Sequence, residues 1–426
     1  MDIVDFLDEN LIILIGQQTY HAKWEIVILQ KEQFTLKNLS TFNFRKMLLL
    51  VKEQQERERS QSPAPGSDSS INKYRDTLPA KAQNFNVSAW SLIKQLVQSK
   101  NFRFSVPVEL LEPLSLLQTI EDYPRIAMAY VAAFAVSRYA ASAYRAMRKP
   151  FNPIEGETFE YLDNKLEYKF IAEQVSHHPP ISAVNVKGRD WELTQSVDFD
   201  LSMWGRTFTV TPKSPVDLVL QNFKESYRWN KVKTRVQDIF RDGRYIEHVG
   251  EMVVSSSTHY CCKINFEEKT HNVFGNVYDT GNERVMEIRG MWSSHLEIVK
   301  TGQTPRKIWS INSLPPNHKE YYGFTYFALS LNDLTKDIRN LLPPTDSRFR
   351  TDKNLLEDGK IKEAALEKQR LEELQRSRCK QGSSRRAMWF NLSTASTLKR
   401  RIYNFTDKYW DMRSKKFDKL CFEPLW

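Results

Sequence analysis

Apolar and polar residues alternate along the middle of the chain. From about residue 158 to residue 300 the alternation has a period of two, which is typical of β-strands with one buried face. We predict strands at residues 193–199, 207–212, 216–220, 248–254, 260–266, 284–292 and 295–299. Short turn-like pieces separate them, so we expect one antiparallel sheet that curls into a sandwich or a barrel. The interior of a barrel of this size could hold an apolar ligand.

The pattern becomes helical on either side of this region. Residues 85–96 and 110–120 favour amphipathic helices, and residues 126–147 are apolar nearly all round, as in a helix packed on most sides. Residues 355–378 carry six acidic and six basic side chains, many of them four positions apart, and predict one long surface helix. Nearer the N-terminus, residues 24–30 predict a strand and residues 44–54 a short helix.

Composition divides the chain into three parts. Residues 1–51 contain no recognisable domain, residues 52–75 are charged and rich in Ser and Pro, as in a linker, and residues 76–426 remain for one large domain. Four cysteines, two of them adjacent, give neither a disulfide framework nor zinc-ligand spacing. The N-terminus lacks the basic start of a signal peptide, and the apolar runs are shorter than the roughly 20 residues that cross a bilayer. We therefore expect a soluble protein of the cytoplasm.

The net charge of +10 is concentrated towards the C-terminal end. Residues 380–420 contain 11 basic and three acidic side chains, with aromatic residues interleaved among them. A basic segment favours an anionic partner, namely a nucleic acid, an acidic protein or an anionic membrane, and the alternative is a solvated tail. The segment contains no recognisable RNA-binding motif, so we expect an anionic membrane surface and no nucleic acid as partner.

Two adjacent histidines form the most distinctive local motif. The sequence EQVSHHPP at residues 173–180 places His177 and His178 directly before two prolines. Neighbouring residues of a strand point to opposite faces, and no Cys or carboxylate partners recur nearby, so we expect no metal site. Because the prolines stiffen the backbone, two imidazole donors are held where they could bind a phosphate. Two ordinary surface histidines before a turn are the alternative.

Two further groups of polar residues could bind an anion. KPFNPIEGE at residues 149–157 places Lys149 at the end of the predicted apolar helix and Asn152 between two prolines. Lys368, Glu372 and Arg376 follow one another at intervals of four residues, so they share one face of the predicted long helix. The alternatives are a lysine that caps a helix C-terminus and a solvated row of ion pairs.

Together these blocks resemble the oxysterol-binding protein family. EQVSHHPP is the signature of that family, and KPFNPxxGE and VAAFAVS (131–137) precede it. The blocks YYGFTxFA (321–328), LLPPTDSRFR (341–350) and EKQRLEELQR (367–376) follow in the family's order. WNKV (229–232) and Tyr409-Trp410 also fit. The chain is identified as a member over roughly residues 76–426.

The resemblance implies an α+β fold, a large incomplete antiparallel β-barrel that encloses a lipid tunnel, with an N-terminal lid and helices before it and C-terminal helices after it. Members extract a lipid, often a sterol, and carry it through the cytosol, and many exchange it for phosphatidylinositol 4-phosphate (PI4P). By motif, the headgroup ligands would be Lys149, Asn152, His177, His178, Lys368, Glu372 and Arg376. A phosphomonoester with a charge near −2 needs several convergent donors.

A carrier of this kind is not an enzyme and needs no cofactor. We expect it to dock transiently on organelle membranes, while its second lipid, its membranes and any receptor protein stay unidentified. One rival function is a phosphoinositide sensor that binds the headgroup without transferring lipid. Another is a hydrolase that uses His177 and His178, for which the sequence offers neither a nucleophile nor a metal site.

The sequence departs from the family pattern at four places, one of which is the segment NFRFSVPVEL at residues 101–110, where a basic lid-end segment is usual. Glu155 stands where an apolar residue is usual, Leu111 replaces the usual Asn, and the stretch between Gln118 and Val131 is shorter than in relatives. Since the shortened stretch is helical in relatives and lines the domain, its loss would affect closure of the tunnel and lipid transfer more than headgroup binding.

Overall fold

The computed structural model describes residues 11–17, 24–30, 77–80, 108, 111–115, 128–145, 148–164, 166–240, 243–300, 302–381, 385–396 and 401–426. The chain divides into two compact units, residues 1–73 and 74–426, and each is described by itself. In the first unit, β1 (Leu11–Gln17) and β2 (Trp24–Gln30) form an antiparallel hairpin. The strand predicted at residues 24–30 is confirmed, whereas the helices predicted at residues 44–54 and 85–96 lie outside the described residues.

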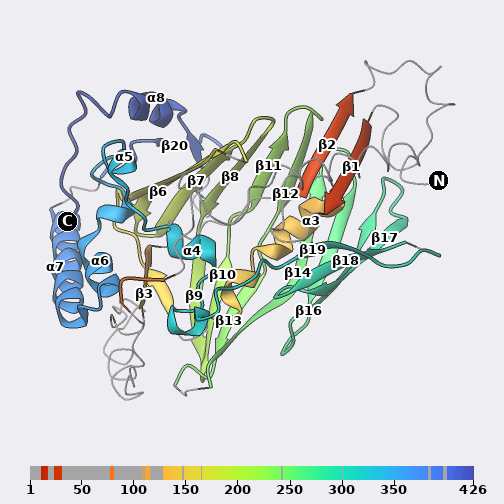
Figure 1. Cartoon of the computed structure of the whole chain (residues 1–426), viewed down its shortest axis with the longest axis horizontal. Helices are drawn as coiled ribbons and strands as arrows, with labels where there is room; N and C mark the ends of the chain where they lie inside the picture. Colours follow the sequence, from red (N-terminus) through yellow and green to blue (C-terminus); the bar gives the residue numbers. More distant parts are fainter. Residues whose placement is uncertain are drawn as a thin grey trace, which may run out of the picture. The chain divides into compact units, whose positions relative to one another are not determined.

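The second unit is built around one antiparallel sheet of 15 strands (Figure 1). The strands are β5 (Thr158–Asp163), β6 (Tyr168–His177), β7 (Pro180–Lys187), β8 (Trp191–Val197), β9 (Phe199–Trp204), β10 (Thr207–Pro212), β11 (Val216–Leu220), β12 (Glu225–Trp229), β13 (Lys233–Gln237), β14 (Tyr245–Ser256), β15 (Cys261–Phe266), β16 (Asn272–Tyr278), β17 (Arg284–Met291), β18 (His295–Val299) and β19 (Arg306–Ser310). The main path runs β19-β18-β17-β16-β15-β14-β12-β11-β8-β7-β6-β5, and β9, β10 and β13 branch from it. Because β19 and β5 are not paired with each other, the sheet curves without closing and forms an incomplete barrel.

The strands predicted from the alternating pattern are all present. Those at residues 207–212, 216–220 and 295–299 coincide with β10, β11 and β18, and the others differ at their ends. β14 is longer than predicted, because its first half pairs with β13 and its last residues pair with β12. β6 is among the strands that were not predicted individually, and the reason is its burial. Only one residue in the interior of β6 is exposed, so the strand has no polar face to give an alternating pattern.

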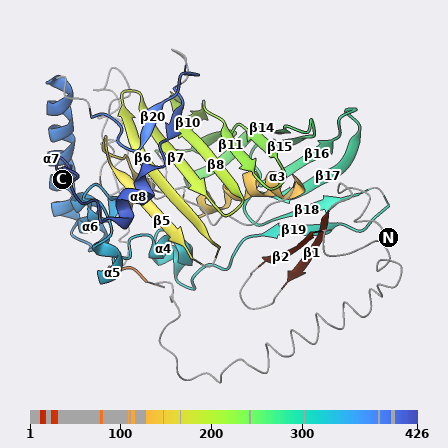
Figure 2. The ribbon, with the colours of Figure 1, turned by 90° about the horizontal axis from the view of Figure 1, so that it is seen from above.

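A short helix fills the concave side of the sheet. α3 (Met128–Ser137) lies within the curve of the strands (Figure 2), and residues 131–136 are buried. The edge of the Phe134 ring packs against Trp229 of β12, with 6.1 Å between the ring centroids. The helix predicted at residues 126–147 is therefore shorter in the structure. After Ser137 the chain continues through a turn into the 3-10 helix η6 (Ala140–Ser142).

A small parallel strand pair replaces part of a predicted helix. β3 (Leu111–Ser115) pairs with β4 (Lys149–Phe151), so the helix predicted at residues 110–120 is wrong where the structure describes it. Pro113 disfavours a helix at this point, and Leu111 is buried in a cluster with Phe151 and Leu356. Lys149 accordingly begins a strand and does not cap a helix C-terminus, which corrects that alternative.

Helices follow the sheet. They are η7 (His318–Glu320), α4 (Tyr326–Ser330), α5 (Lys336–Arg339), η8 (Ser347–Phe349), α6 (Thr351–Glu357) and α7 (Ile361–Lys380). The long helix predicted at residues 355–378 is confirmed from Ile361 onward as α7, but its first part is wrong, because Gly359 adopts a φ of 76° and separates α6 from α7. Within the described part of the chain, no helix combines the length and the apolar character needed to span a membrane.

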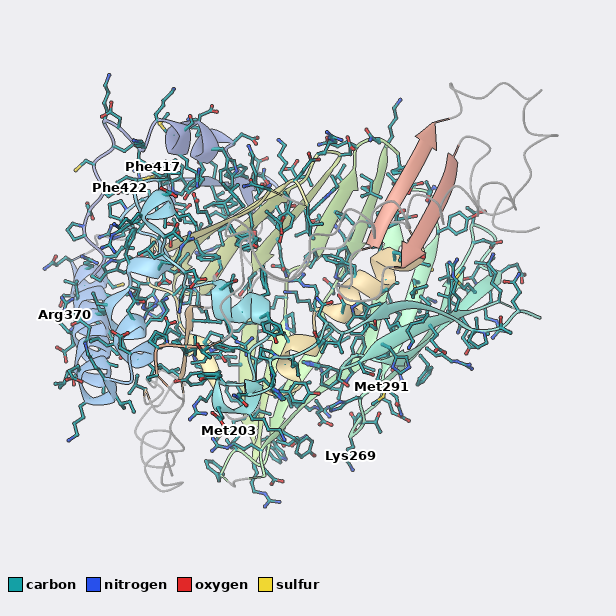
Figure 3. All side chains as sticks on the ribbon, viewed as in Figure 1. Met203, Lys269, Met291, Arg370, Phe417 and Phe422 are labelled. Carbon is teal, nitrogen blue, oxygen red and sulfur yellow. The ribbon has the colours of Figure 1, made fainter. Side chains whose placement is uncertain are left out.

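The basic C-terminal segment packs against the outer face of the sheet. It contains β20 (Phe390–Leu392), β21 (Tyr403–Phe405) and α8 (Lys408–Ser414). Trp389, Phe390 and Tyr409 are buried in one cluster with Ile171 of β6 and Ile181 of β7. Phe417 and Phe422, labelled in Figure 3, lie farther along and are 5.8 Å apart. Most of the aromatic residues interleaved with the basic charges are thus buried or half-buried. They cover the outer face of β6 and β7.

Candidate functional site

Lys149 is the first residue of the short strand β4, and Asn152 begins the stretch that leads from β4 to β5; residues 149–157 are together called the Lys149 loop. The Lys149 ammonium donates to Oδ1 of Asn152 at 2.9 Å and to the carbonyl oxygen of Pro150 at 2.8 Å. The Lys149 side chain is half-buried and the Asn152 side chain is exposed. Both polar ends are therefore held together at the surface of the second unit.

Helix α7 brings further charged groups to this loop. The Lys368 ammonium lies 2.5 Å from Oε1 of Glu372, one turn farther along the helix. Burial lowers the pKa of Lys149 to about 7, and the positive charges of Lys368 and Arg350 lower it further, while Glu372 acts in the opposite sense. Lys149 thus lies near two other cations, in surroundings that disfavour its charged form. Such a cluster is suited to an anionic ligand.

The histidine pair lies at the end of β6. His177 is the last residue of the strand, and the rings of His177 and His178 are 4.1 Å apart between centroids. The expectation that the two side chains point to opposite faces is wrong here, because the strand ends and the chain turns through a cis peptide bond between His178 and Pro179. The His177 ring is half-buried and His178 is exposed.

Gln375 of α7 connects the histidines to the Lys149 loop. Its Nε2 lies 2.9 Å from Nδ1 and 2.8 Å from Nε2 of His177, and its Oε1 accepts a hydrogen bond from the Glu155 backbone N–H at 3.1 Å. Gln375 is three positions after Glu372, so the two side chains lie on the same side of α7. The sequence analysis missed this residue, although it stands inside the EKQRLEELQR block.

The structure therefore brings most of the predicted site residues together. Lys149 and Asn152 are bonded to each other, Lys368 and Glu372 adjoin them, and His177 joins the group through Gln375. His178 contacts the group through the His177 ring. Arg376 is exposed on α7, and within the described residues its side chain forms no hydrogen bond or ion pair.

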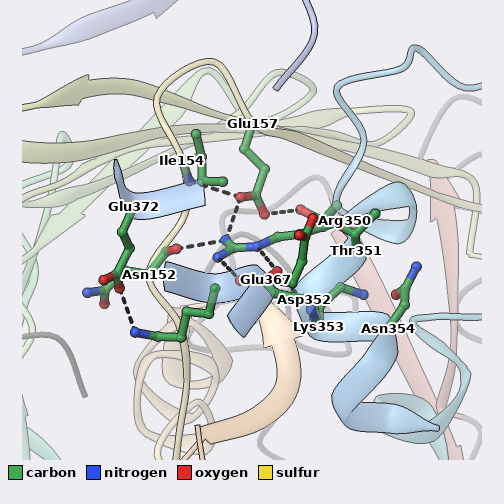
Figure 4. A network of polar contacts seen from close by, with 12 residues as sticks. Asn152, Ile154, Glu157, Arg350, Thr351, Asp352, Lys353, Asn354, Glu367 and Glu372 are labelled. Atoms are coloured by element: carbon green, nitrogen blue, oxygen red, sulfur yellow. Dashed lines mark hydrogen bonds and ion pairs between the residues drawn. The ribbon is translucent and has the colours of Figure 1, made fainter. Parts of the chain in front are cut away.

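A buried ionic network lies directly behind the loop (Figure 4). The guanidinium of Arg350 makes two hydrogen bonds to the Asp352 carboxylate, at 2.8 and 3.0 Å, and an ion pair with Glu157 at 2.8 Å. Burial disfavours the charge of Arg350, but the adjacent Asp352 and Glu157 carboxylates raise its pKa above the ordinary value. The sequence analysis assigned no role to these residues, although Glu157 and Arg350 stand in two of the blocks.

The one carboxylate of the signature motif, that of Glu173, holds the C-terminal segment. Glu173 is buried, and its oxygens accept hydrogen bonds from the backbone N–H groups of Met388 at 2.7 Å and Trp389 at 2.9 Å. Burial raises the pKa of Glu173 to about 7, although these hydrogen bonds favour the ionised form. Glu173 is therefore a structural residue that fixes the C-terminal segment on β6.

Glu155, which departs from the family pattern, is accommodated by Arg385. Glu155 is buried, and its Oε2 lies 3.4 Å from the backbone nitrogen of Arg385. The adjacent Gly156 has a φ of 88°, and a Cβ there would lie 3.1 Å from Cδ of Arg385. The Glu155 carboxylate, which stands where an apolar side chain is usual, therefore has a hydrogen-bond donor in the backbone N–H of Arg385.

The chain is similar in sequence to known proteins. Residues 88–414 match the model of the family described as oxysterol-binding protein. The chain is 38% identical over 339 residues to mouse oxysterol-binding protein-related protein 3, covering 73% of this chain and 39% of that protein. It is 34% identical over 383 residues to human oxysterol-binding protein-related protein 6, covering 83% and 41% respectively. The chain thus spans about two fifths of the length of these curated relatives.

Solved structures resemble the fold over nearly their whole length. The Osh3 ORD of Saccharomyces cerevisiae in complex with PI(4)P has a TM-score of 0.74 and 28% identity, with 83% of this chain and 99% of that chain covered. The Osh1 ORD domain in complex with cholesterol has a TM-score of 0.71 and 29% identity, with coverages of 81% and 93%. With the sequence blocks, the incomplete barrel and the family match in agreement, this chain belongs to the oxysterol-binding protein family.

Proposed function

We propose that this chain binds PI4P through Lys149 and the residues around it, and that it carries a sterol or a similar lipid and PI4P between membranes. The observation that supports the proposal is the convergence of Lys149, His177 and Lys368, which lie on three separate segments, around the Lys149 loop, where Asn152 is exposed. The complexes of the Osh3 ORD with PI(4)P and of the Osh1 ORD with cholesterol support the two classes of ligand.

The chemistry of the cluster suits a phosphomonoester. An incoming phosphate with a charge near −2 would accept hydrogen bonds from the Lys149 and Lys368 ammonium groups and from the two imidazoles. Glu372 already holds Lys368 and would direct it, and the exposed Arg376 would add a contact at the rim. We assign Asn152 to the same headgroup because its amide stands beside the Lys149 ammonium.

The apolar part of the lipid belongs, in this proposal, in a tunnel on the concave side of the sheet. That side carries the large apolar cluster of α3 and the inward faces of the strands. The protein acts as a carrier and not as an enzyme, and it works from the cytoplasm on anionic membranes. Exposed lysines of the C-terminal segment supply the membrane contact, since its aromatic residues are largely buried; they are Lys408, Lys415, Lys416 and Lys419.

The decisive experiment replaces both histidines with alanine. We expect His177→Ala/His178→Ala to lose extraction of PI4P from liposomes by at least about tenfold, because two donors to the phosphate disappear. Loading with a fluorescent sterol and the circular dichroism spectrum should stay unchanged. His295→Ala, which alters a half-buried histidine on β18, is the matched control. Undiminished PI4P extraction by the double variant would refute the headgroup site.

Transfer is tested separately from binding. Donor liposomes with PI4P and acceptor liposomes with sterol are mixed, and the exchange of both lipids is followed in time. A protein that binds PI4P but moves neither lipid is a sensor, and this result would reject the carrier function while leaving the headgroup site intact.

A further inference from the structure

The loop that carries Lys149 and Asn152 has little regular secondary structure of its own. It contains two prolines, Pro150 within β4 and Pro153 after it, which donate no backbone hydrogen bond, and its backbone bonds include one from Glu157 N–H to the Ile154 carbonyl and one from Gly156 N–H to Gln174. A loop of this kind needs other contacts to keep one conformation.

Arg350 and Glu157 supply those contacts from the buried side. Nη1 of Arg350 donates to the carbonyl oxygen of Asn152 at 2.8 Å, and the guanidinium lies over the Phe151 ring, 5.1 Å from its centroid. Oε2 of Glu157 accepts from the backbone N–H of Ile154 at 2.9 Å. Each residue from Phe151 to Ile154 except Pro153 is thus contacted by Arg350 or by Glu157.

The pair is itself fixed by the surrounding structure. Oε1 of Glu157 accepts from the Ser347 hydroxyl at 2.6 Å, and Asp352 holds the other edge of the Arg350 guanidinium. Arg350 is 3% exposed and Glu157 is fully buried, so solvent does not compete for these hydrogen bonds. The Arg350–Glu157 pair is therefore held in one arrangement on the buried side of the Lys149 loop.

We propose that the buried Arg350–Glu157 pair is a positioning device that holds the Lys149–Asn152 loop in its ligand-binding conformation. This inference rests on the proposed headgroup site and adds two residues that determine affinity without touching the ligand. Pre-organising a loop raises affinity because less conformational entropy is lost on binding.

The chain contains a matched control for this proposal. Arg348 is also buried, makes two hydrogen bonds to the carboxylate of Asp346 at 2.8 and 2.9 Å, and lies over an aromatic ring, that of Phe159, at 4.9 Å. Its remaining hydrogen bond goes to the Glu160 carbonyl oxygen at 3.0 Å and not to the loop. Arg348→Lys and Arg350→Lys therefore each disturb a buried ion pair over an aromatic ring, but only the second also affects Glu157 and releases the Asn152 carbonyl.

The test measures PI4P and sterol affinity together with thermal stability for the full chain. We expect both lysine variants to lower the unfolding temperature to a similar extent. Arg350→Lys should weaken binding of short-chain PI4P by roughly tenfold and change fluorescent-sterol affinity by less than about twofold. Arg348→Lys should leave the ratio of the two affinities unchanged. A merely structural role for Arg350 would lower both affinities in parallel.

A second pair of variants covers the case in which the lysine variants do not fold. Glu157→Gln removes one acceptor from the pair, whereas Glu160→Gln alters a neighbouring buried carboxylate that bonds Tyr409 and Arg413. If the Glu157→Gln variant binds PI4P as tightly as the Glu160→Gln control, the proposal is overturned. If His177→Ala/His178→Ala abolishes PI4P binding while the Arg350 and Glu157 variants do not weaken it, only this inference fails. If the histidine variant also binds normally, the headgroup site itself is wrong.

Discussion

The affinity for PI4P should fall steeply above pH 7, because Lys149 loses its proton there in the empty protein. Burial and the charges of Lys368 and Arg350 lower its pKa to about 7, whereas Glu372 is the acidic group that partly opposes them. Glu157 and Asp352 face Arg350 from behind and moderate its charge. A phosphate dianion beside Lys149 would restore the proton, so binding above pH 7 is coupled to proton uptake.

The size of the effect follows from the fraction of Lys149 that is already protonated. With a pKa of about 7, that fraction falls from about one half at pH 7 to about 3% at pH 8.5. The apparent affinity should therefore weaken about fifteenfold across this interval, or about 1.6 kcal/mol. The phosphate, whose second pKa is about 6, stays mostly doubly charged in this range.

The assay is titration calorimetry of short-chain PI4P at pH 7.0, 7.5, 8.0 and 8.5 in buffers of different ionisation enthalpy, which counts the protons taken up. Lys149→Arg keeps its charge at every pH and should lose the slope, whereas Lys149→Met should bind weakly with little dependence on pH. An affinity of the unmodified protein that is constant from pH 7 to 8.5, or a slope that persists in Lys149→Arg, would refute the reasoning.

Two further predictions concern the scaffold. Glu173→Ala should lower the free energy of unfolding by roughly 2–4 kcal/mol, because the buried backbone N–H of Trp389 and the partly buried N–H of Met388 lose their acceptor. Thermal unfolding and limited proteolysis of the C-terminal segment would check this, and a protease pattern like that of the unmodified protein would contradict it. Gly275→Ala should cost about 3 kcal/mol or more, since its Cβ would lie 2.2 Å from the Lys263 carbonyl oxygen across the β15–β16 pair. Gly243→Ala, where no atom lies within 4 Å of the added Cβ, is its control, and equal unfolding temperatures for the two variants would argue against the clash.

The sequence alone determined much of the sheet and the identity of the headgroup candidates. A strand with one face in the core and one in solvent alternates polar and apolar residues, so β10, β11 and β18 could be predicted to the residue. The chemistry of His177, His178 and Lys149 could likewise be recognised from residue type and local stiffness. These are properties of short segments, which a chain displays before it folds.

The tertiary structure decided which segments meet. β6 shows no clear alternation because the C-terminal segment covers its outer face, and residues 111–115 form a strand because a partner, β4, lies beside them. Lys149 and Lys368 are more than 200 positions apart, and their mutual effect on proton affinity exists only where α7 packs against the loop. The roles of Arg350, Glu157 and Gln375 depend in the same way on distances between remote segments. Local periodicity records exposure to solvent, and it carries no information on such distances, which are fixed only when the sheet curves and the helices close against it.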